Sequence, residues 1–231
     1  MQVNVFWRFA LSSTLALLLM SCSNNLMETR LDGFDKGKRT MKLEYTLDKA
    51  KLPDGQGGFK LQTLFHLAQG DKVTMKTTRT AMLNQDYSLS HTTAEKQVNK
   101  DFTNFETRAE NGKVIIKKMI AGKEPEISEI EHQGPIYIEL HPLMYFGDLK
   151  QPGTEKTYKA LYEDKGTIHD VTIKLVGPTT IYLDSLPVPA LHYQLQSITA
   201  PAEYDDYYLN PRTGNIIKIA FGQIEFFPRS S

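Results

Sequence analysis

The sequence predicts a mainly β protein in which one strongly curved antiparallel sheet forms a half-barrel or open barrel with a short plug helix. The first observation is a hydrophobic period of two through most of residues 40–228, which is typical of strands with one buried face. Leu43, Tyr45 and Leu47, for example, alternate with charged or hydroxyl side chains. The second observation is that no amphipathic helix of useful length interrupts these runs, so parallel strands with crossover helices are not expected.

The first half of this region predicts a meander of about seven strands with short connections. Pro53 opens a glycine-rich loop at residues 53–58. Asn111-Gly112 is a strong hairpin signal, because both residues tolerate the left-handed backbone of a two-residue turn. The alternating runs lie at residues 43–47, 59–67, 73–83, 87–98, 102–108, 114–120 and 127–131.

Residues 134–153 break the alternation. Pro142 fits the first turn of a short helix, with His141 at the cap position. The side chains that follow are too apolar for a helix facing solvent, so we expect one or two helical turns that plug an open edge or end of the sheet. The predicted plug residues are Leu143, Met144, Tyr145 and Phe146.

The second half resumes the period of two and brings the expected total to about thirteen strands. Turns are predicted at residues 164–166 and at Gly177-Pro178, and a tight loop at residues 210–215. The expected strands lie at residues 157–162, 171–175, 180–183, 191–195, 203–209, 217–221 and 224–227.

The N-terminal segment predicts export and a lipid anchor. The apolar run at residues 9–22 follows a single cation, Arg8, and is shorter than the roughly 20 residues that a membrane-spanning helix needs. Its end, with Leu19, Ser21 and Cys22, resembles the lipobox of bacterial lipoproteins, in which the cysteine is lipidated after cleavage. The alternatives are an ordinary secretion signal with an incidental cysteine, or an apolar core helix.

This interpretation divides the chain into a signal peptide at residues 1–21, a lipidated tether at 22–39 and a β-domain at 40–228. In the alternative for the tether, its apolar residues dock on the domain: Leu26, Met27, Leu31 and Phe34. Ser23 stands where lipoproteins retained in the inner membrane commonly carry Asp. The resemblance therefore favours the outer membrane, with the domain facing the periplasm and Cys22 as its membrane contact.

Composition excludes some classes of partner and of stabilisation. Lys and Arg number 27 and Asp and Glu 27, so no excess charge indicates a nucleic-acid partner. Cys22 is the single cysteine, so no intrachain disulfide can form and the fold must depend on its core.

Catalytic and metal motifs are not found in the sequence. No Gly-x-Ser-x-Gly motif is present, and the six histidines are not spaced as metal ligands. Glu203, Asp205 and Asp206 form an acidic group that fits a solvated loop better than a calcium site. The acids of residues 124–131 fit an exposed strand, although two distant carboxylates could still converge in a cleft. The sequence therefore favours a protein without catalytic residues, metal or cofactor.

A further resemblance rests on the order of motifs after residue 140. The short apolar helix is followed by Pro152-Gly153, by two strands, by the segment LPVPALHY at 186–193, and by YYLNPRTGNIIKI at 207–219. This order resembles a "domain of unknown function" family of bacterial envelope proteins, similar in shape to the half-barrel Lol carriers of the lipoprotein-sorting system. The resemblance implies a curved β-sheet and an envelope role, but it provides no catalytic residue.

These observations lead to a functional hypothesis with two alternatives. We expect a non-catalytic envelope lipoprotein that binds an apolar ligand, a lipid or a lipoprotein in a half-barrel groove. The plug residues Leu143, Met144, Tyr145 and Phe146 would gate this groove, and Tyr162 and Tyr193 would form its wall, unless these aromatics are plain core. The alternatives are a structural or assembly partner in an envelope complex and a carboxylate-dependent hydrolase.

Overall fold

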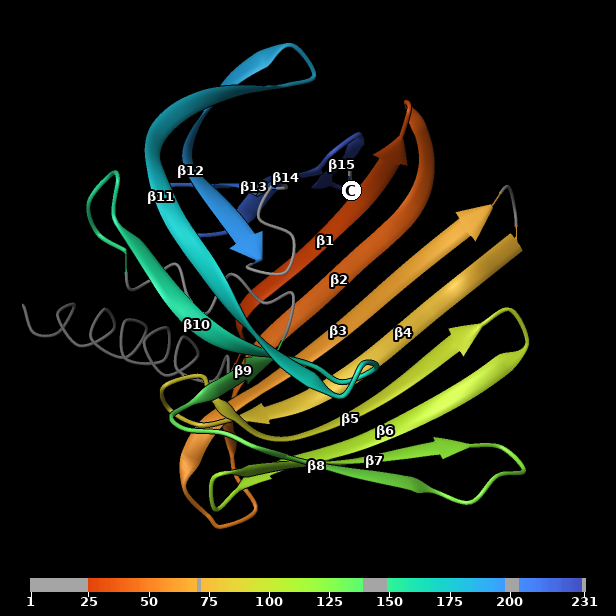
Figure 1. Cartoon of the computed structure of the whole chain (residues 1–231). Helices are drawn as coiled ribbons and strands as arrows, with labels where there is room; N and C mark the ends of the chain where they lie inside the picture. The colour runs from red at the N-terminus through yellow and green to blue at the C-terminus, as the bar shows by residue number, and fades with distance from the viewer. Residues whose placement is uncertain (1–24, 70–71, 139–148, 198–203, 230–231) are drawn as a thin grey trace, which may run out of the picture.

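The computed structural model describes residues 25–69, 72–138, 149–197 and 204–229, and these form fifteen strands (Figure 1). The strands are β1 (Asn25–Asp35), β2 (Lys38–Lys51), β3 (Gly57–Gln69), β4 (Lys72–Leu83), β5 (Leu89–Val98), β6 (Asp101–Glu110), β7 (Lys113–Ile120), β8 (Glu126–Glu131), β9 (Ile136–Ile138), β10 (Glu155–Tyr162), β11 (Thr167–Leu183), β12 (Leu186–Ser197), β13 (Tyr204–Leu209), β14 (Ile216–Phe221) and β15 (Ile224–Pro228).

All fifteen strands belong to one sheet, in the order β8-β7-β6-β5-β4-β3-β2-β1-β15-β14-β13-β12-β11-β10-β9. Every neighbouring pair is antiparallel except β9 and β10, which are parallel. The prediction of a mainly β protein built on one large curved sheet is therefore confirmed. Within the described ranges there is no helix long and apolar enough to cross a membrane.

β1 shows that the predicted flexible tether is wrong for most of its length. Residues 25–35 pair with β2 on one side and with β15 on the other, so they join the two halves of the sheet. Leu31 is fully buried in the core, as the docking alternative expected. The alternation of apolar side chains is weak here because Glu28 and Arg30 share the strand with Gly33.

Gly33 is required by this junction. A Cβ atom at this position would lie 2.6 Å from the ring of Phe226 and 2.7 Å from the Cβ of Met41. Any side chain at residue 33 would therefore push β15 away from β1. With glycine there, the ring of Phe226 fills the space above the backbone. The final strand is thus fitted against the first by a contact that only glycine allows.

Two sequence signals for turns have different outcomes. Asn111 and Gly112 have φ values of 51° and 74° and form the expected hairpin between β6 and β7. Gly177-Pro178, in contrast, does not turn the chain, because the two strands expected on either side are one strand, β11. Gly177, with φ of 140°, follows a bulge after Leu175 instead, which lets the strand bend without ending.

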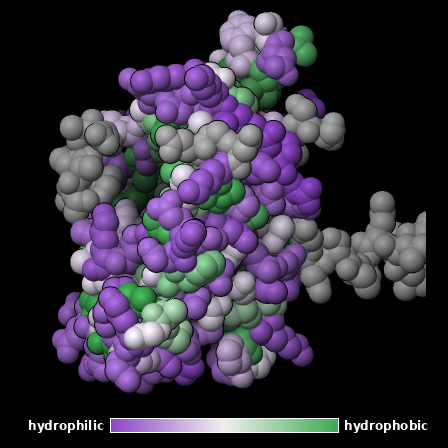
Figure 2. Space-filling model, turned by 90° about the vertical axis from the view of Figure 1, so that its right-hand side faces the viewer, coloured by the Kyte–Doolittle hydropathy of each residue, from purple (hydrophilic) through white to green (hydrophobic). Residues whose placement is uncertain are grey.

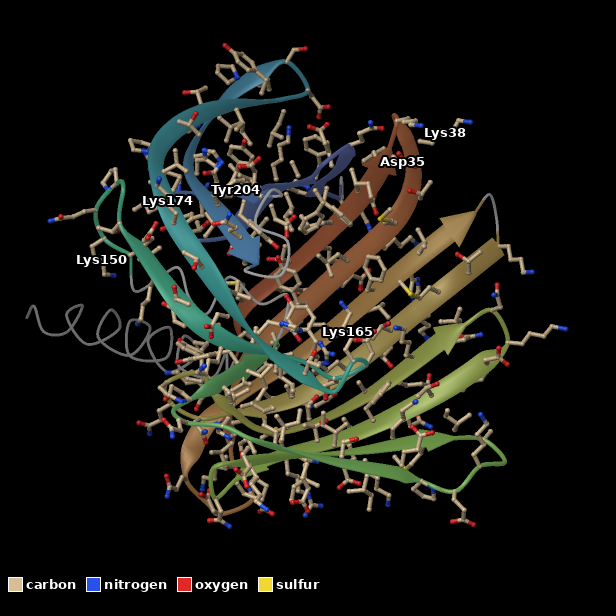
Figure 3. The ribbon with its side chains drawn as sticks, viewed as in Figure 1. Asp35, Lys38, Lys150, Lys165, Lys174 and Tyr204 are labelled. Atoms are coloured by element: carbon tan, nitrogen blue, oxygen red, sulfur yellow. The ribbon has the colours of Figure 1, made fainter. Side chains whose placement is uncertain are left out.

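The sheet closes on itself by overlap. β9 lies against β5, and the lower ends of β10 and β11 cross in front of β4 and β5 (Figure 1). Lys165, in the turn between β10 and β11, is in front of these strands in Figure 3, whereas Asp35 and Lys38 lie at the far rim. In the described part of the chain, no ladder joins the two outermost strands, β8 and β9.

One apolar core occupies the interior of this rolled sheet. It draws on both halves of the chain, from Leu31 in β1 to Phe226 in β15. In contrast, hydrophilic residues cover most of the outer face seen in Figure 2. The predicted plug helix at residues 139–148 lies outside the described residues, and the described residues just before it form β9, which the sequence did not predict.

Candidate functional site

The overlap is held by a charged side chain in the turn at residues 163–166. Glu163 is 4 % exposed. Its Oε2 accepts a hydrogen bond from Nη2 of Arg79 in β4 at 2.6 Å. Its Oε1 accepts one from the hydroxyl of Thr107 in β6 at 2.7 Å. A carboxylate from the second half of the chain is therefore neutralised and bonded by two strands of the first half.

The rest of the turn makes weaker contacts near the surface. The carboxylate of Asp164 accepts a hydrogen bond from Lys96 Nζ in β5 at 2.9 Å, and both side chains are about a third exposed. Lys165 lies over the ring of Tyr162, 5.4 Å from its centroid. The turn thus contacts β4, β5 and β6 without joining their ladders.

A group of tyrosines faces the interior beside this turn. Tyr207 and Tyr193 are directly opposite each other on β13 and β12, and both are almost fully buried. Burial raises the pKa of Tyr207 well above 10, and the nearby Asp205, Tyr45 and Tyr162 raise it further. The first and second halves of the chain therefore meet at these phenol groups.

Among the described residues, several buried hydroxyls have no hydrogen-bond partner, and three of them are on residues of the core. They belong to Thr29, Tyr45 and Thr92, none of which is more than 6 % exposed. Thr29 and Tyr45 are opposite each other on β1 and β2, so their side chains share one face of the sheet. Burial raises the pKa of Tyr45 far above its usual value of 10, which keeps this phenol neutral.

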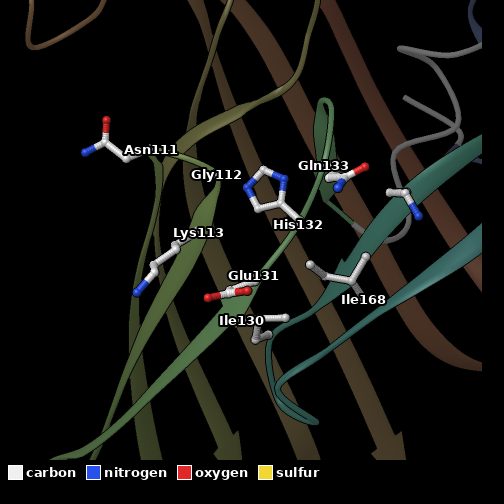
Figure 4. A pocket seen from close by; sticks show the side chains of 9 residues that line it. Asn111, Gly112, Lys113, Ile130, Glu131, His132, Gln133 and Ile168 are labelled. Atoms are coloured by element: carbon white, nitrogen blue, oxygen red, sulfur yellow. The ribbon is translucent and has the colours of Figure 1, made fainter.

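We call the boundary between the two overlapping parts of the sheet the seam. Near the ends of β7 and β8, a hollow lies along this boundary (Figure 4). A space of about 640 Å³ lies between the β7–β8 hairpin and the paired strands β10 and β11. Ile130 and Ile168 line it from opposite sides, and Lys113 and Lys159 flank it. His132 lies at the same opening. Its Nδ1 donates a hydrogen bond to the carbonyl oxygen of Gly134 at 2.9 Å.

The structure places two of the predicted binding residues and leaves five unplaced. Tyr193 is in the interior beside Tyr207, and Tyr162 is close enough to raise the pKa of Tyr207. The remaining predicted residues lie outside the described part of the chain: Cys22, Leu143, Met144, Tyr145 and Phe146.

The sequence analysis missed Arg79, Thr107, Glu163 and the unpartnered hydroxyls. One signal for Arg79 was available, because it shares the parity of Ala81 and Leu83 on its strand. A charge at an inward position needs a buried partner. The sequence does not show which of its 27 acids supplies that partner.

Three of the acids considered earlier have polar partners among the described residues. Glu126 and Glu129 make ion pairs with Lys118 and Lys113 on exposed β8. Asp206 accepts hydrogen bonds from His192 and Gln194. Within the described ranges, no three side chains of His, Cys, Asp or Glu could hold a metal ion.

Comparisons with known proteins support the fold. No known protein family and no curated protein matches the sequence. Among solved structures, the chain is similar to a β-barrel-like protein of a domain of unknown function, DUF1849, from Brucella abortus. The TM-score is 0.53 and the identity 10 %, over 87 % of this chain and 94 % of that one. At this identity the likeness concerns the fold, which is a β-barrel-like arrangement of unknown function.

Proposed function

We propose that the protein is a lipid-anchored component of a bacterial envelope, without catalytic activity, that binds an apolar or amphiphilic ligand inside its barrel. Lipidated Cys22 would hold it at the outer membrane, with the barrel in the periplasm. The ligand would be a lipid or the acyl part of a lipoprotein, with its polar end among Tyr45, Tyr162, Tyr193 and Tyr207.

The observation that carries this proposal is the combination of an overlap without backbone pairing and interior hydroxyls without a hydrogen-bond partner. A buried hydroxyl without a partner costs about 1–3 kcal/mol, and the described residues include such hydroxyls on Thr29, Tyr45 and Thr92. A ligand with a polar end would supply the missing partners.

The seam supports a route for entry. No ladder is broken when the turn at residues 163–166 moves, because in the described chain the overlap depends on side-chain contacts of that turn. The hollow of about 640 Å³ lies between the ends of β7 and β8 and the strands β10 and β11. Strands held by backbone hydrogen bonds would not separate as readily.

The position of β1 supports a close anchor. β1 begins at Asn25, three residues after Cys22, and three extended residues span at most about 10 Å. A lipid on Cys22 would therefore hold this end of the barrel against the bilayer surface. The mature tether would be much shorter than the sequence alone predicts.

Loading of a fluorescent fatty acid, cis-parinaric acid, tests the binding proposal. The full chain with Cys22→Ala would carry Lys96→Cys and Asp164→Cys, joined by a short bis-maleimide across the seam. We expect loading at least tenfold slower than in the unlinked chain, and a roughly fivefold weaker affinity for Tyr45→Phe, about one lost hydrogen bond.

The matched control joins Lys118→Cys to Glu126→Cys, an exposed ion pair of the same 2.9 Å length that lies within the β7–β8 hairpin. This link should leave loading unchanged. Equal loading rates with both links, or no saturable binding by the unlinked chain, would overturn the proposed binding site.

The anchor is tested separately by fractionation of the host cells. The wild-type chain should be found with the membranes, and Cys22→Ala should leave that fraction. If the variant stays in the membranes, the lipid anchor is wrong.

A second candidate is the assembly role in an envelope complex. A specific observation favours it, because the hairpin between β11 and β12 exposes Tyr182 and Leu186 to 70 % and 67 %. Large apolar side chains that are exposed on both faces of one hairpin end indicate a site of contact with another molecule.

A further inference from the structure

The distal part of the β11–β12 hairpin projects from the barrel as a two-stranded ribbon (Figure 1). β10 pairs with β11 only as far as Lys174, and β13 pairs with β12 only from Leu191. Beyond these residues, and among the strands that the structure describes, the two strands pair only with each other, up to Leu183 and Leu186. We define this distal ribbon as residues 176–190.

The end of the distal ribbon is apolar on both faces. Tyr182 and Pro187 are opposite each other, and Leu183 and Leu186 follow as the next pair, on the other face. Tyr182 and Leu186 are the most exposed large hydrophobic side chains among the described residues. Figure 2 shows this projection at its top, where apolar, weakly polar and hydrophilic residues lie together.

Charge on the distal ribbon is limited to one carboxylate. Asp184, in the turn with Ser185, has φ of 49°, and no Lys or Arg occurs between Lys174 and Arg212. Exposed ribbons that avoid contact usually carry lysine. This ribbon lacks that protection and would be attracted to a partner surface with basic residues around an apolar cleft.

Prolines restrict how a partner can bind. Pro187 and Pro189 are exposed on β12, and proline has no N–H to donate to an added strand. Strand addition along this edge of the ribbon is therefore disfavoured. Along the β12 edge, contact through side chains such as Leu186 and Pro187 is therefore favoured over strand addition.

The anchor decides between a membrane and a protein as the partner. Figure 1 shows β1 running toward the end of the molecule from which the ribbon projects. β1 has 11 residues, a length of about 36 Å at 3.3 Å per residue. Since the proposed lipid attaches just before the start of β1, the ribbon would point away from the bilayer.

We infer that the distal ribbon is a docking surface for a second protein, which receives Tyr182 and Leu186 in an apolar cleft with a basic rim. The direction of the ribbon relative to the bilayer rests on the proposed anchor at Cys22. The exposure and the composition of the ribbon are independent of that anchor. The inference goes beyond ligand binding in the barrel, because no residue of the ribbon belongs to the tyrosine group.

Site-specific photo-crosslinking in the host bacterium tests this inference. The full chain would carry p-benzoylphenylalanine in place of Tyr182, of Leu186 or, as the control, of Ile127, which is 66 % exposed on β8. We expect one common adduct from Tyr182 and Leu186 and none from Ile127. Asp184→Lys should lower its yield at least tenfold without changing the thermal midpoint of the purified chain.

The other outcomes identify what else covers the ribbon. An adduct of twice the chain's mass would show a second copy as the occupant, and flotation of the Cys22→Ala chain with phosphatidylglycerol vesicles, lost in Tyr182→Ser/Leu186→Ser, would show a membrane. Either result, or an adduct insensitive to Asp184→Lys, would overturn the inference. If only the proposed lipid anchor is wrong, the crosslinking results stay as expected, and the error is seen in the fractionation of Cys22→Ala.

Discussion

β11 connects two turns of opposite character. At its start, the turn at residues 163–166 carries three charged side chains, yet Glu163 is only 4 % exposed. At its end, Asp184 and Ser185 form the turn to β12, and the apolar side chains of Tyr182 and Leu186 near this turn are about two-thirds exposed. Burial therefore follows the place of each turn in the rolled sheet and not the polarity of its residues.

The difference shows what each turn does for the molecule. A buried carboxylate must find a charged partner, so Glu163 fixes the overlap of the two halves in one register with Arg79 and Thr107. Among the described residues, no ion pair or side-chain hydrogen bond joins the distal ribbon to the barrel, and Tyr182 and Leu186 at its end are largely exposed. Four changes test this contrast, beginning with the largest expected effect.

Replacing Arg79 should destabilise the protein most. Arg79→Met leaves the Glu163 carboxylate buried with Thr107 as its hydrogen-bond donor, and loss of one partner of a buried ion pair typically costs about 3–5 kcal/mol. The free energy of unfolding, measured by urea denaturation, should fall by that amount. Arg108→Met is the matched control, because Arg108 makes an ion pair with Glu106 at 61 % exposure, and its effect should stay below about 1 kcal/mol.

A second substitution separates the lost charge partner from lost packing. In Arg79→Met/Glu163→Gln, the neutral amide can still accept the Thr107 hydroxyl, so at least half of the lost stability should return. If the double variant is as unstable as the sum of the single variants, the ion pair is not the contact that closes the barrel.

The interior phenols should make stability fall in alkali. Burial raises the pKa of both Tyr45 and Tyr207, so above pH 10 the unfolded chain loses these protons while the folded chain keeps them. The unfolded state then binds fewer protons, and the free energy of unfolding decreases by about 1.4 kcal/mol per pH unit for each tyrosine. Urea denaturation between pH 9.5 and 11 would measure this slope.

Tyr45→Phe should reduce this slope by up to about 1.4 kcal/mol per pH unit and leave stability near neutral pH unchanged or higher, since its hydroxyl has no partner. Tyr182→Phe, at the exposed end of β11, should leave the slope unchanged because it removes no buried hydroxyl. Equal slopes for wild type and Tyr45→Phe would mean that water or a ligand reaches Tyr45.

The same contrast explains what the sequence could and could not predict. Local patterns determine strands, so the alternation at Leu43, Tyr45 and Leu47 and the Asn111-Gly112 turn were enough for the fold class and most strands. β1 was missed because Gly33 and charged neighbours conceal its apolar face, and β9 because three residues are too few to show a period. The overlap that closes the sheet joins residues far apart in the sequence, so no local pattern predicts it.

The candidate site illustrates this limit. Tyr162 and Tyr193 were selected as aromatic residues in the second half, but their companion Tyr45 comes from the second strand and meets them only through the rolling of the sheet. Glu163 stands in an ordinary Asp-Lys-Gly turn sequence. Its burial depends on Arg79, which lies 84 residues away, so only the three-dimensional structure pairs them.

A smaller effect is expected one residue further along the buried turn. Asp164 makes an ion pair with Lys96 near the surface, so Asp164→Asn should lower the free energy of unfolding by only about 0.2–1 kcal/mol. Added salt screens such a pair, and the difference from wild type should vanish in 1 M sodium chloride. A salt-independent loss comparable to that of Arg79→Met would show that the whole turn, and not Glu163 alone, is desolvated.

The smallest effect on stability is expected at the opposite end of β11. Tyr182→Ser/Leu186→Ser should change the free energy of unfolding by less than about 0.5 kcal/mol, because substitutions of exposed side chains without partners rarely matter. Ile181→Ala is the matched control within the same ribbon, since Ile181 is 9 % exposed and its truncation should cost about 2 kcal/mol or more. If the double variant is destabilised as much as Ile181→Ala, Tyr182 and Leu186 serve the packing of the chain itself. The inference that the ribbon is a docking surface for a partner would then be wrong.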